Sequence, residues 1–194
     1  VFDALRLGFA DRTFLIGTGI SLRRIAIGYG ISIVFGLLLG LLIAMNKFLE
    51  NTVGSLVLSL QSLPSICWLP LAVLWFGLSE NAILFVVIMG SLLAVTINTE
   101  TGVRNVPKIY MLAGRNLGAN GARLFLYVML PASLPYLISG LKQGWAFAWR
   151  SLISGEMIFV SMGLGHLLMM GRDLNDMSQV LAVMILIMIL GYIV

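Results

Sequence analysis

Long stretches without a charged residue limit most strongly what this chain can fold into. Residues 25–46, 51–79 and 81–99 contain no Asp, Glu, Lys or Arg, and 177–194 carries no charge up to the last residue. A helix needs roughly 20 apolar residues to cross the hydrocarbon layer of a bilayer. The runs are about that long, and the whole chain is 60% hydrophobic and only 10% charged. Lipid is therefore the expected solvent for most of its surface.

The same runs predict α-helices and not the strands of a β-barrel. Barrel strands alternate apolar and polar residues over about ten positions, whereas these runs are apolar on every face. A further run at 133–155 is long enough, although it contains two cations. We predict one all-α, multi-pass membrane domain of about five spans, near 25–46, 53–78, 81–99, 133–155 and 177–194. Neither end has the features of a natural terminus, so more chain is expected on both sides.

Basic residues predict the orientation of these spans. Between the third and fourth spans lie Arg104, Lys108, Arg115 and Arg123, opposed there by Glu100. Loops rich in Lys and Arg stay in the cytoplasm. The loop at 104–131 is therefore predicted to be cytoplasmic and the segment 156–176 external. The same count places the pair Arg23 and Arg24 outside, against the rule.

Prolines and glycines suggest how the spans are shaped and packed. Pro64 and Pro70 interrupt the second span, and a proline inside a helix removes a backbone hydrogen bond and kinks the axis. Such a break survives in lipid where protein or a water-filled cavity satisfies the freed groups. The GxxxG spacings at 36–40 and 140–144 allow helices to approach closely, and packing is their favoured interpretation.

The cytoplasmic loop is predicted to form two short helices joined by a tight turn. Pro107 suits a helix entry, and no breaker follows before Leu117. Gly118 can adopt the left-handed conformation that ends a helix, and Asn120 is a candidate N-cap for the second helix. Pro131 is expected to end that helix.

Two interpretations of this loop are open from the residues alone. Ala113 and Gly114 lie near the end of the first helix, where small side chains would let the surface of another protein come close. An amphipathic helix held at the bilayer surface by anionic lipid would also fit the mixture of basic and apolar residues.

The loop resembles the EAA loop of the permease subunits of bacterial ABC importers. The family pattern is Glu-Ala-Ala, three residues, Gly, nine residues, then Ile-x-Leu-Pro. Here it is found as Leu112-Ala113-Gly114, Gly118 and Val128-Met129-Leu130-Pro131, with Leu112 in place of Glu and Gly114 in place of the second Ala. The stretches SLRRIAIGYG, LQSLPSICWLPLAVLWFGLSE and GLGHLL are similar to the nitrate, sulfonate and taurine branch of this family.

The resemblance implies a type I (MetI-like) importer fold in the bacterial inner (plasma) membrane. It further implies a second permease subunit, expected to be a second copy, two cytoplasmic ATPase subunits that carry ATP and Mg, and an external binding protein that delivers a small anion such as nitrate, a sulfonate or taurine. The loop would be the coupling helix seated in a groove of the ATPase. The residues that the resemblance assigns to this contact are Leu112, Ala113, Gly114, Arg115, Gly118, Ala119, Arg123 and Pro131.

Chemistry of its own is not expected from this chain. Nothing matches GxxxxGK[ST], the loop that cradles nucleotide phosphates, so hydrolysis is assigned to a partner and no cofactor, catalytic residue or nucleic-acid contact is predicted. His166 has no second ligand at metal-binding spacing, and Asp173 with Asp176 is expected to form a solvated turn. Cys67 is predicted to be a small buried hydrophobe.

Charges inside a span are costly, so Lys142 and Arg150 attract attention. They are eight positions apart, which is about 80° around a helix, so they lie broadly on one side. They could line a pathway for anions, or extend toward headgroups at opposite membrane faces. The candidate pathway residues are Asn98, Lys142, Trp149, Arg150 and Glu156, although Trp149 also suits a subunit interface and Glu156 could pair with a cation across it.

Two other classes of protein compete with an importer. An ATP-independent channel or secondary transporter would work without an ATPase, and such transporters often contain an internal repeat, which this sequence does not clearly show. An intramembrane enzyme would need converging polar residues, which are also not evident.

Overall fold

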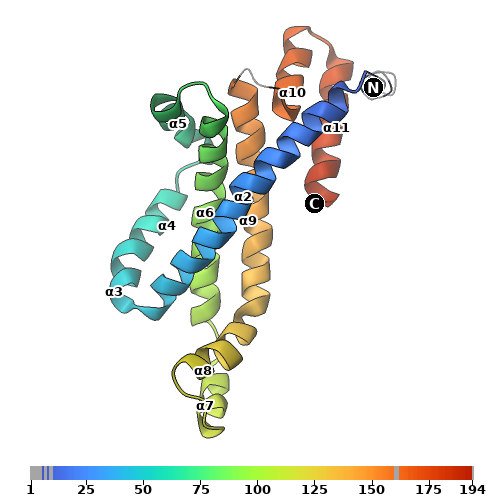
Figure 1. Cartoon of the computed structure of the whole chain (residues 1–194). Coiled ribbons are helices and arrows are strands. Elements are labelled where there is room, and N and C mark those ends of the chain that lie inside the picture. Colours follow the sequence, from blue (N-terminus) through green and yellow to red (C-terminus); the bar gives the residue numbers. More distant parts are fainter. Residues whose placement is uncertain (1–5, 7, 9–10, 160–161, 194) are drawn as a thin grey trace. The chain divides into compact units, whose positions relative to one another are not determined.

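The computed structural model describes residues 6, 8, 11–159 and 162–193, and every secondary-structure element in this part of the chain is helical (Figure 1). The predicted all-α class is confirmed. The elements are α2 Thr13–Met45, α3 Lys47–Leu49, the π-helix η1 Glu50–Gly54, α4 Ser55–Gln61, the 3₁₀ helix η2 Ser65–Trp68, α5 Leu69–Phe76, α6 Glu80–Arg104, α7 Lys108–Asn116, α8 Ala122–Leu124, the π-helix η3 Phe125–Met129, α9 Leu130–Ile158, α10 Leu164–Asp173 and α11 Met177–Ile193.

Three helices in the described ranges are long and apolar enough to cross a membrane. They are Thr13–Met45, Glu80–Arg104 and the continuous run Ala122–Ile158. The pair Lys47–Gln61 and Ser65–Phe76 makes a fourth if it is counted as one bent span, while Met177–Tyr192 is a shorter apolar helix. By length and composition, the fifth predicted span at 177–194 is thus the weakest.

The second predicted span is sharply bent. Its two halves differ in direction by 102°, and the break ends at Pro64. Pro70 does not break the chain, because it lies in the first turn of α5, where its missing N–H has no partner to lose. Cys67 follows the bend and is exposed, so its predicted burial is wrong. An apolar run predicts contact with lipid as readily as contact with protein.

Helix α2 begins at Thr13, well before the predicted start of a span at residue 25. Arg23 and Arg24 therefore lie inside a helix and not in a loop before it. Arg24 is buried, and the carboxylates paired with it compensate its positive charge in place of water.

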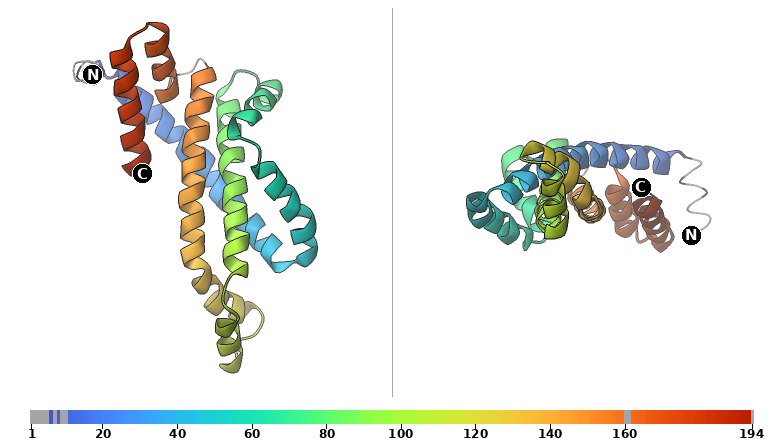
Figure 2. Two further views of the ribbon diagram at one scale, coloured as in Figure 1. Left: turned by 180° about the vertical axis from the view of Figure 1, so that it is seen from behind. Right: turned by 90° about the horizontal axis from the view of Figure 1, so that it is seen from below.

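The chain divides into two compact units. The first comprises residues 1–31, 64–90 and 146–194. Its α10 and α11 lie side by side (Figure 2). Among the described residues, a hydrophobic cluster joins Phe14 of α2 to these two helices through Leu167, Ala182 and Val183.

The second unit comprises residues 32–63 and 91–145, and its helices approach closely at glycines. A Cβ at Gly36 would lie 2.9 Å from Val95, and one at Gly40 would lie 2.6 Å from the carbonyl oxygen of Thr96. A Cβ at Gly140 would lie 2.5 Å from Asn98. The GxxxG spacing at 36–40 and the first glycine of the spacing at 140–144 therefore contribute to helix packing within the chain, as predicted.

Candidate functional site

The loop at 104–131 folds into a helical hairpin within the second unit. Helix α7 and the following α8–η3 segment lie next to each other beyond the C-terminal end of α6 (Figure 1). Gly118 has φ +85°. The N–H of Gly118 donates to the carbonyl of Arg115 at 2.9 Å, and that of Ala119 donates to Gly114 at 2.9 Å. These two bonds form a Schellman motif, so the predicted glycine end of α7 is confirmed.

The start of the second helix differs from the prediction. Gly121, with φ +54°, and not Asn120, immediately precedes α8, and no side chain caps this helix. Asn120 instead uses its backbone carbonyl to accept a hydrogen bond from the N–H of Arg123 at 3.2 Å. The second left-handed glycine shifts the helix start by one residue, which moves Asn120 out of the capping position.

Gly114 lies inside the hairpin. A Cβ at this position would meet Leu124 and Val128 side-chain carbons, both at 2.8 Å. The small residue therefore lets α7 pack on the α8–η3 segment, and its missing side chain faces the inside of the hairpin. Ala113, its neighbour, is exposed and remains available for contact with another protein's surface.

Pro131 does not end the second helix. The run Ala122–Ile158 is continuous and contains the π-helix Phe125–Met129, in which the N–H of Leu130 donates to the carbonyl of Phe125. A proline removes its own backbone donor and crowds the carbonyl four residues before it, and here the wider π turn lies directly before Pro131. The second half of the hairpin and the long helix α9 therefore form one uninterrupted helical run.

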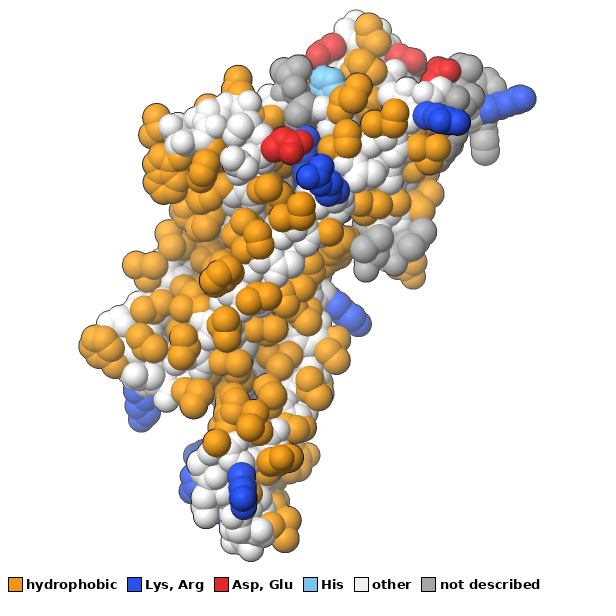
Figure 3. Space-filling view, in the orientation of Figure 1, with side chains coloured by type: hydrophobic (Ala, Val, Ile, Leu, Met, Phe, Trp, Pro, Cys, Tyr) orange, Lys and Arg blue, Asp and Glu red, His pale blue; other side chains and the backbone are white. Residues whose placement is uncertain are grey.

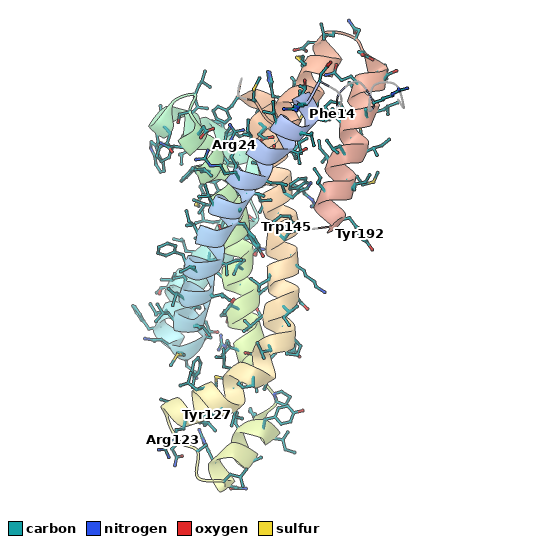
Figure 4. The ribbon with its side chains drawn as sticks, turned by 45° about the vertical axis from the view of Figure 1, so that its right-hand side comes forward. Phe14, Arg24, Arg123, Tyr127, Trp145 and Tyr192 are labelled. Atoms are coloured by element: carbon teal, nitrogen blue, oxygen red, sulfur yellow. The ribbon has the colours of Figure 1, made fainter. Side chains whose placement is uncertain are left out.

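The outer surface of the hairpin combines exposed apolar and basic side chains. Leu112 is 58% exposed, Leu117 89% and Tyr127 77%. Arg115 and Arg123 are also exposed. Lys and Arg side chains lie on the hairpin in Figure 3, and Figure 4 marks Arg123 and Tyr127 on it. A surface of this kind suits a protein partner that offers both apolar contact and negative charge.

The candidate pathway residues are distributed over both units. In the second unit, the Asn98 side chain donates to Gln143 at 2.8 Å, and Lys142 is exposed. In the first unit, Arg150 is exposed, with its guanidinium carbon 5.8 Å from the centre of the Phe147 ring. Trp149 is buried, and its ring atoms would lie 2.8 Å from a Cβ at Gly191, so this side chain packs on α11.

Glu156 forms the centre of a buried ion-pair network in the first unit. Its carboxylate accepts from Arg24 Nη1 at 3.0 Å, from Ser21 Oγ at 2.8 Å and from the N–H of Gly165 at 3.1 Å. Arg24 also pairs with Glu80 at 2.9 Å. The Glu156 side chain is fully buried and that of Arg24 is 6% exposed. The cation that pairs with Glu156 therefore comes from the same chain.

This network also holds the connection between α9 and α10. Arg24 Nη1 donates to the carbonyl of Met162 at 2.9 Å, and Ser21 Oγ accepts from the N–H of Leu164 at 3.0 Å. The roles of Ser21 and Arg24 were missed because the sequence predicts a span that starts after them. The sequence signal that could have revealed them is Arg24 itself, a basic residue with apolar residues around it at helical spacing.

Residues 32–194 match the family of binding-protein-dependent transport system inner membrane components. An archaeal protein of Methanocaldococcus jannaschii, provisionally described as an ABC transporter permease, is 33% identical over 91% of this chain and 69% of its own length. The nitrate import permease NrtB of Synechocystis is 28% identical (95% and 67%), and the taurine permease TauC of Escherichia coli is 26% identical (95% and 67%). The chain spans about two thirds of the length of these relatives.

Solved structures agree on the fold. An amino acid ABC transporter chain superposes with a TM-score of 0.80 over 97% of this chain and 92% of its own, at 16% identity. A chain of the MetNI methionine ABC transporter gives 0.79 over 93% and 90%, at 20% identity. The fold is that of a type I ABC importer permease. The chain belongs to the binding-protein-dependent transport system inner membrane components, and its relatives place it in the nitrate, sulfonate and taurine branch.

Proposed function

We propose that this chain is the membrane-spanning permease subunit of an ATP-driven importer in the bacterial plasma membrane. The observation that carries the proposal is the family match over residues 32–194, which includes the whole helical hairpin. The transport pathway would form between this subunit and a second permease subunit, expected to be a second copy. An external binding protein would deliver the cargo.

The hairpin is the proposed docking site for a cytoplasmic ATPase, which would supply ATP and Mg. Its contact residues would be Leu112, Ala113, Arg115, Ala119 and Arg123, with Gly114, Gly118 and Pro131 shaping the backbone. An exposed leucine at 112, where the family pattern has an acid, favours an ATPase groove that offers an apolar contact at this point. ATP-driven closure of the ATPase dimer would then move the hairpin and, through it, α9.

The proposed cargo is a small anion. Relatives named for nitrate and taurine import support this class, and the exposed cations Lys142 and Arg150 would favour it electrostatically. Asn98 is a further proposed pathway residue. Trp149 and Glu156 are buried in the single chain, so they would hold the pathway helices in place without contacting the cargo.

Transport by the complete assembly tests the proposal. The full-length permease would be reconstituted into liposomes with its ATPase and binding protein, and uptake of nitrate, taurine and an aliphatic sulfonate would be measured. We expect uptake only with internal ATP and external binding protein. Equal uptake without ATP would favour the alternative of a channel or secondary transporter. ATP-dependent uptake of neither nitrate nor the sulfonate would overturn the anion assignment.

A further inference from the structure

A second arginine lies where α6 leads into the hairpin. Arg104 is the last residue of α6, and its Nη1 donates to Glu100 at 3.0 Å, one turn earlier in the same helix. The same nitrogen pairs with Glu50, the first residue of η1. The side chains of Arg104 and Glu50 are 36% and 30% exposed. Among the described residues, this is the one ion pair that joins α6 to η1.

Open space lies beside this ion pair. A cavity of about 310 Å³ is lined by residues of α2, η1, α4 and α6, among them Ile43, Glu50 and Glu100. Side chains therefore do not fill the space between these elements along this stretch. By packing, a displacement of α6 would reach η1 only indirectly, through α2, which contacts α6 at Gly40 and η1 at Gly54, so the ion pair provides the direct link.

The other side of α6 is tightly packed at the same level. A Cβ at Gly102 would lie 2.6 Å from the Cβ of Tyr136 on α9. The C-terminal end of α6 is thus held to α9 by close contact and to η1 by charge. The same end of α6 is therefore connected to one neighbour by packing and to the other by an ion pair.

The end of α6 is also close to α7 along the chain. Residues 105–107 connect them, a link that spans at most about 3.5 Å per residue. A force on α7 therefore reaches Arg104 over a short path. From Arg104 it can pass to Glu50 and on to α4, the half of the bent pair that precedes the break at Pro64.

We propose that Arg104 is a positioning residue for coupling, which transmits movement of the hairpin to the bent pair through Glu50. The proposal rests on the proposed function, because it assumes that an ATPase moves the hairpin. Movement of the ATPase would then reach the bent pair through Arg104 and Glu50 as well as through α9. Neither Arg104 nor Glu50 has to touch the cargo or the ATPase for this role.

The test compares three single variants in the reconstituted complete transporter. Arg104→Gln and Glu50→Gln each break the pair, and Lys47→Gln removes a neighbouring exposed charge that forms no ion pair in the described residues. The readout is the number of cargo molecules imported per ATP hydrolysed. We expect the pair-breaking variants to lower this ratio about fivefold or more, with basal hydrolysis within about twofold of wild type and Lys47→Gln unchanged.

Exchange of the two charges provides the rescue. The double variant Arg104→Glu/Glu50→Arg restores an arginine–glutamate pair between α6 and η1, so it should recover at least about half of the wild-type ratio. An unchanged ratio in Arg104→Gln, an equal loss in Lys47→Gln, or no recovery in the double variant would overturn the proposal. If Arg104→Gln does not accumulate in the membrane, Glu50→Gln tests the pair from its other partner. Wild-type transporter without ATP-dependent uptake would instead overturn the proposed function.

Discussion

Each unit of the molecule contains one arginine between two glutamates, and the two networks differ in their surroundings. In the first unit, Arg24 and Glu156 are buried, and a serine hydroxyl and a backbone N–H complete the hydrogen bonding of the carboxylate. In the second unit, Arg104 and Glu50 are partly exposed beside an open cavity. The Arg24–Glu156 pair is thus enclosed by protein, although Glu80 is 61% exposed, whereas the Arg104–Glu50 pair is open to its surroundings.

The difference indicates different roles. Removal of one partner from a buried pair leaves an uncompensated charge, so such a pair persists through any movement that keeps it buried. A partly exposed pair contributes little to stability because water and salt compete for both charges. The Arg24 network therefore fixes the connection between α9 and α10, whereas the Arg104 pair joins the ends of α6 and η1 and adds little to stability.

The largest expected effect on stability comes from the buried network. Arg24→Gln should leave the Glu156 carboxylate buried without its cation and destabilise the permease by about 3–5 kcal/mol. We expect a melting temperature lower by about 10 °C in detergent, or no accumulation in the membrane. The matched control is Arg23→Gln, which removes an exposed cation from the adjacent position. Equal melting temperatures for the two variants would remove the proposed difference between the networks.

An intermediate effect is expected in the hairpin. Gly118→Val forces a β-branched residue to φ +85°, which should cost about 1–2 kcal/mol of local free energy. No atom lies within 4 Å of the missing Cβ, so the strain is confined to the backbone. The subunit should insert normally, while ATP hydrolysis becomes uncoupled from uptake.

Asparagine separates backbone strain from other consequences of losing Gly118. Gly118→Asn should retain most uptake, because asparagine adopts the left-handed conformation more readily than valine. Unchanged uptake per ATP in Gly118→Val would count against the coupling role of the hairpin. Equal losses in both variants would indicate that the side chain, and not the backbone angle, interferes with the partner.

The two networks also mark how far the sequence determines the structure. The apolar runs predict the long helices, and Gly118 predicts the turn, because both depend on local chemistry. The pairing of Arg24 with Glu156 depends on residues more than a hundred positions apart, which no periodicity reveals. The continuity past Pro131 depends on a π turn that proline alone does not predict. Local rules identified the hairpin, and tertiary contacts determined the networks.

A small stability effect is expected when the exposed pair is broken. Arg104→Gln should lower the melting temperature by less than about 3 °C, because both partners can be solvated once they separate. The measurement is the same thermal scan in detergent as for Arg24→Gln. A decrease as large as that of Arg24→Gln would show that the second network is also structural, and would remove the contrast between the units.

The smallest effect on stability should come from the candidate pathway cations, one in each unit. Lys142→Gln and Arg150→Gln should leave the melting temperature within about 2 °C of wild type, because both side chains are exposed in the single chain. If they line the route, anion uptake should fall several-fold, because a positive charge no longer attracts the cargo. If they extend toward headgroups, uptake should be unchanged. Uptake that survives both substitutions would exclude a cationic pathway at these positions, and a loss confined to one variant would assign the attraction to that unit.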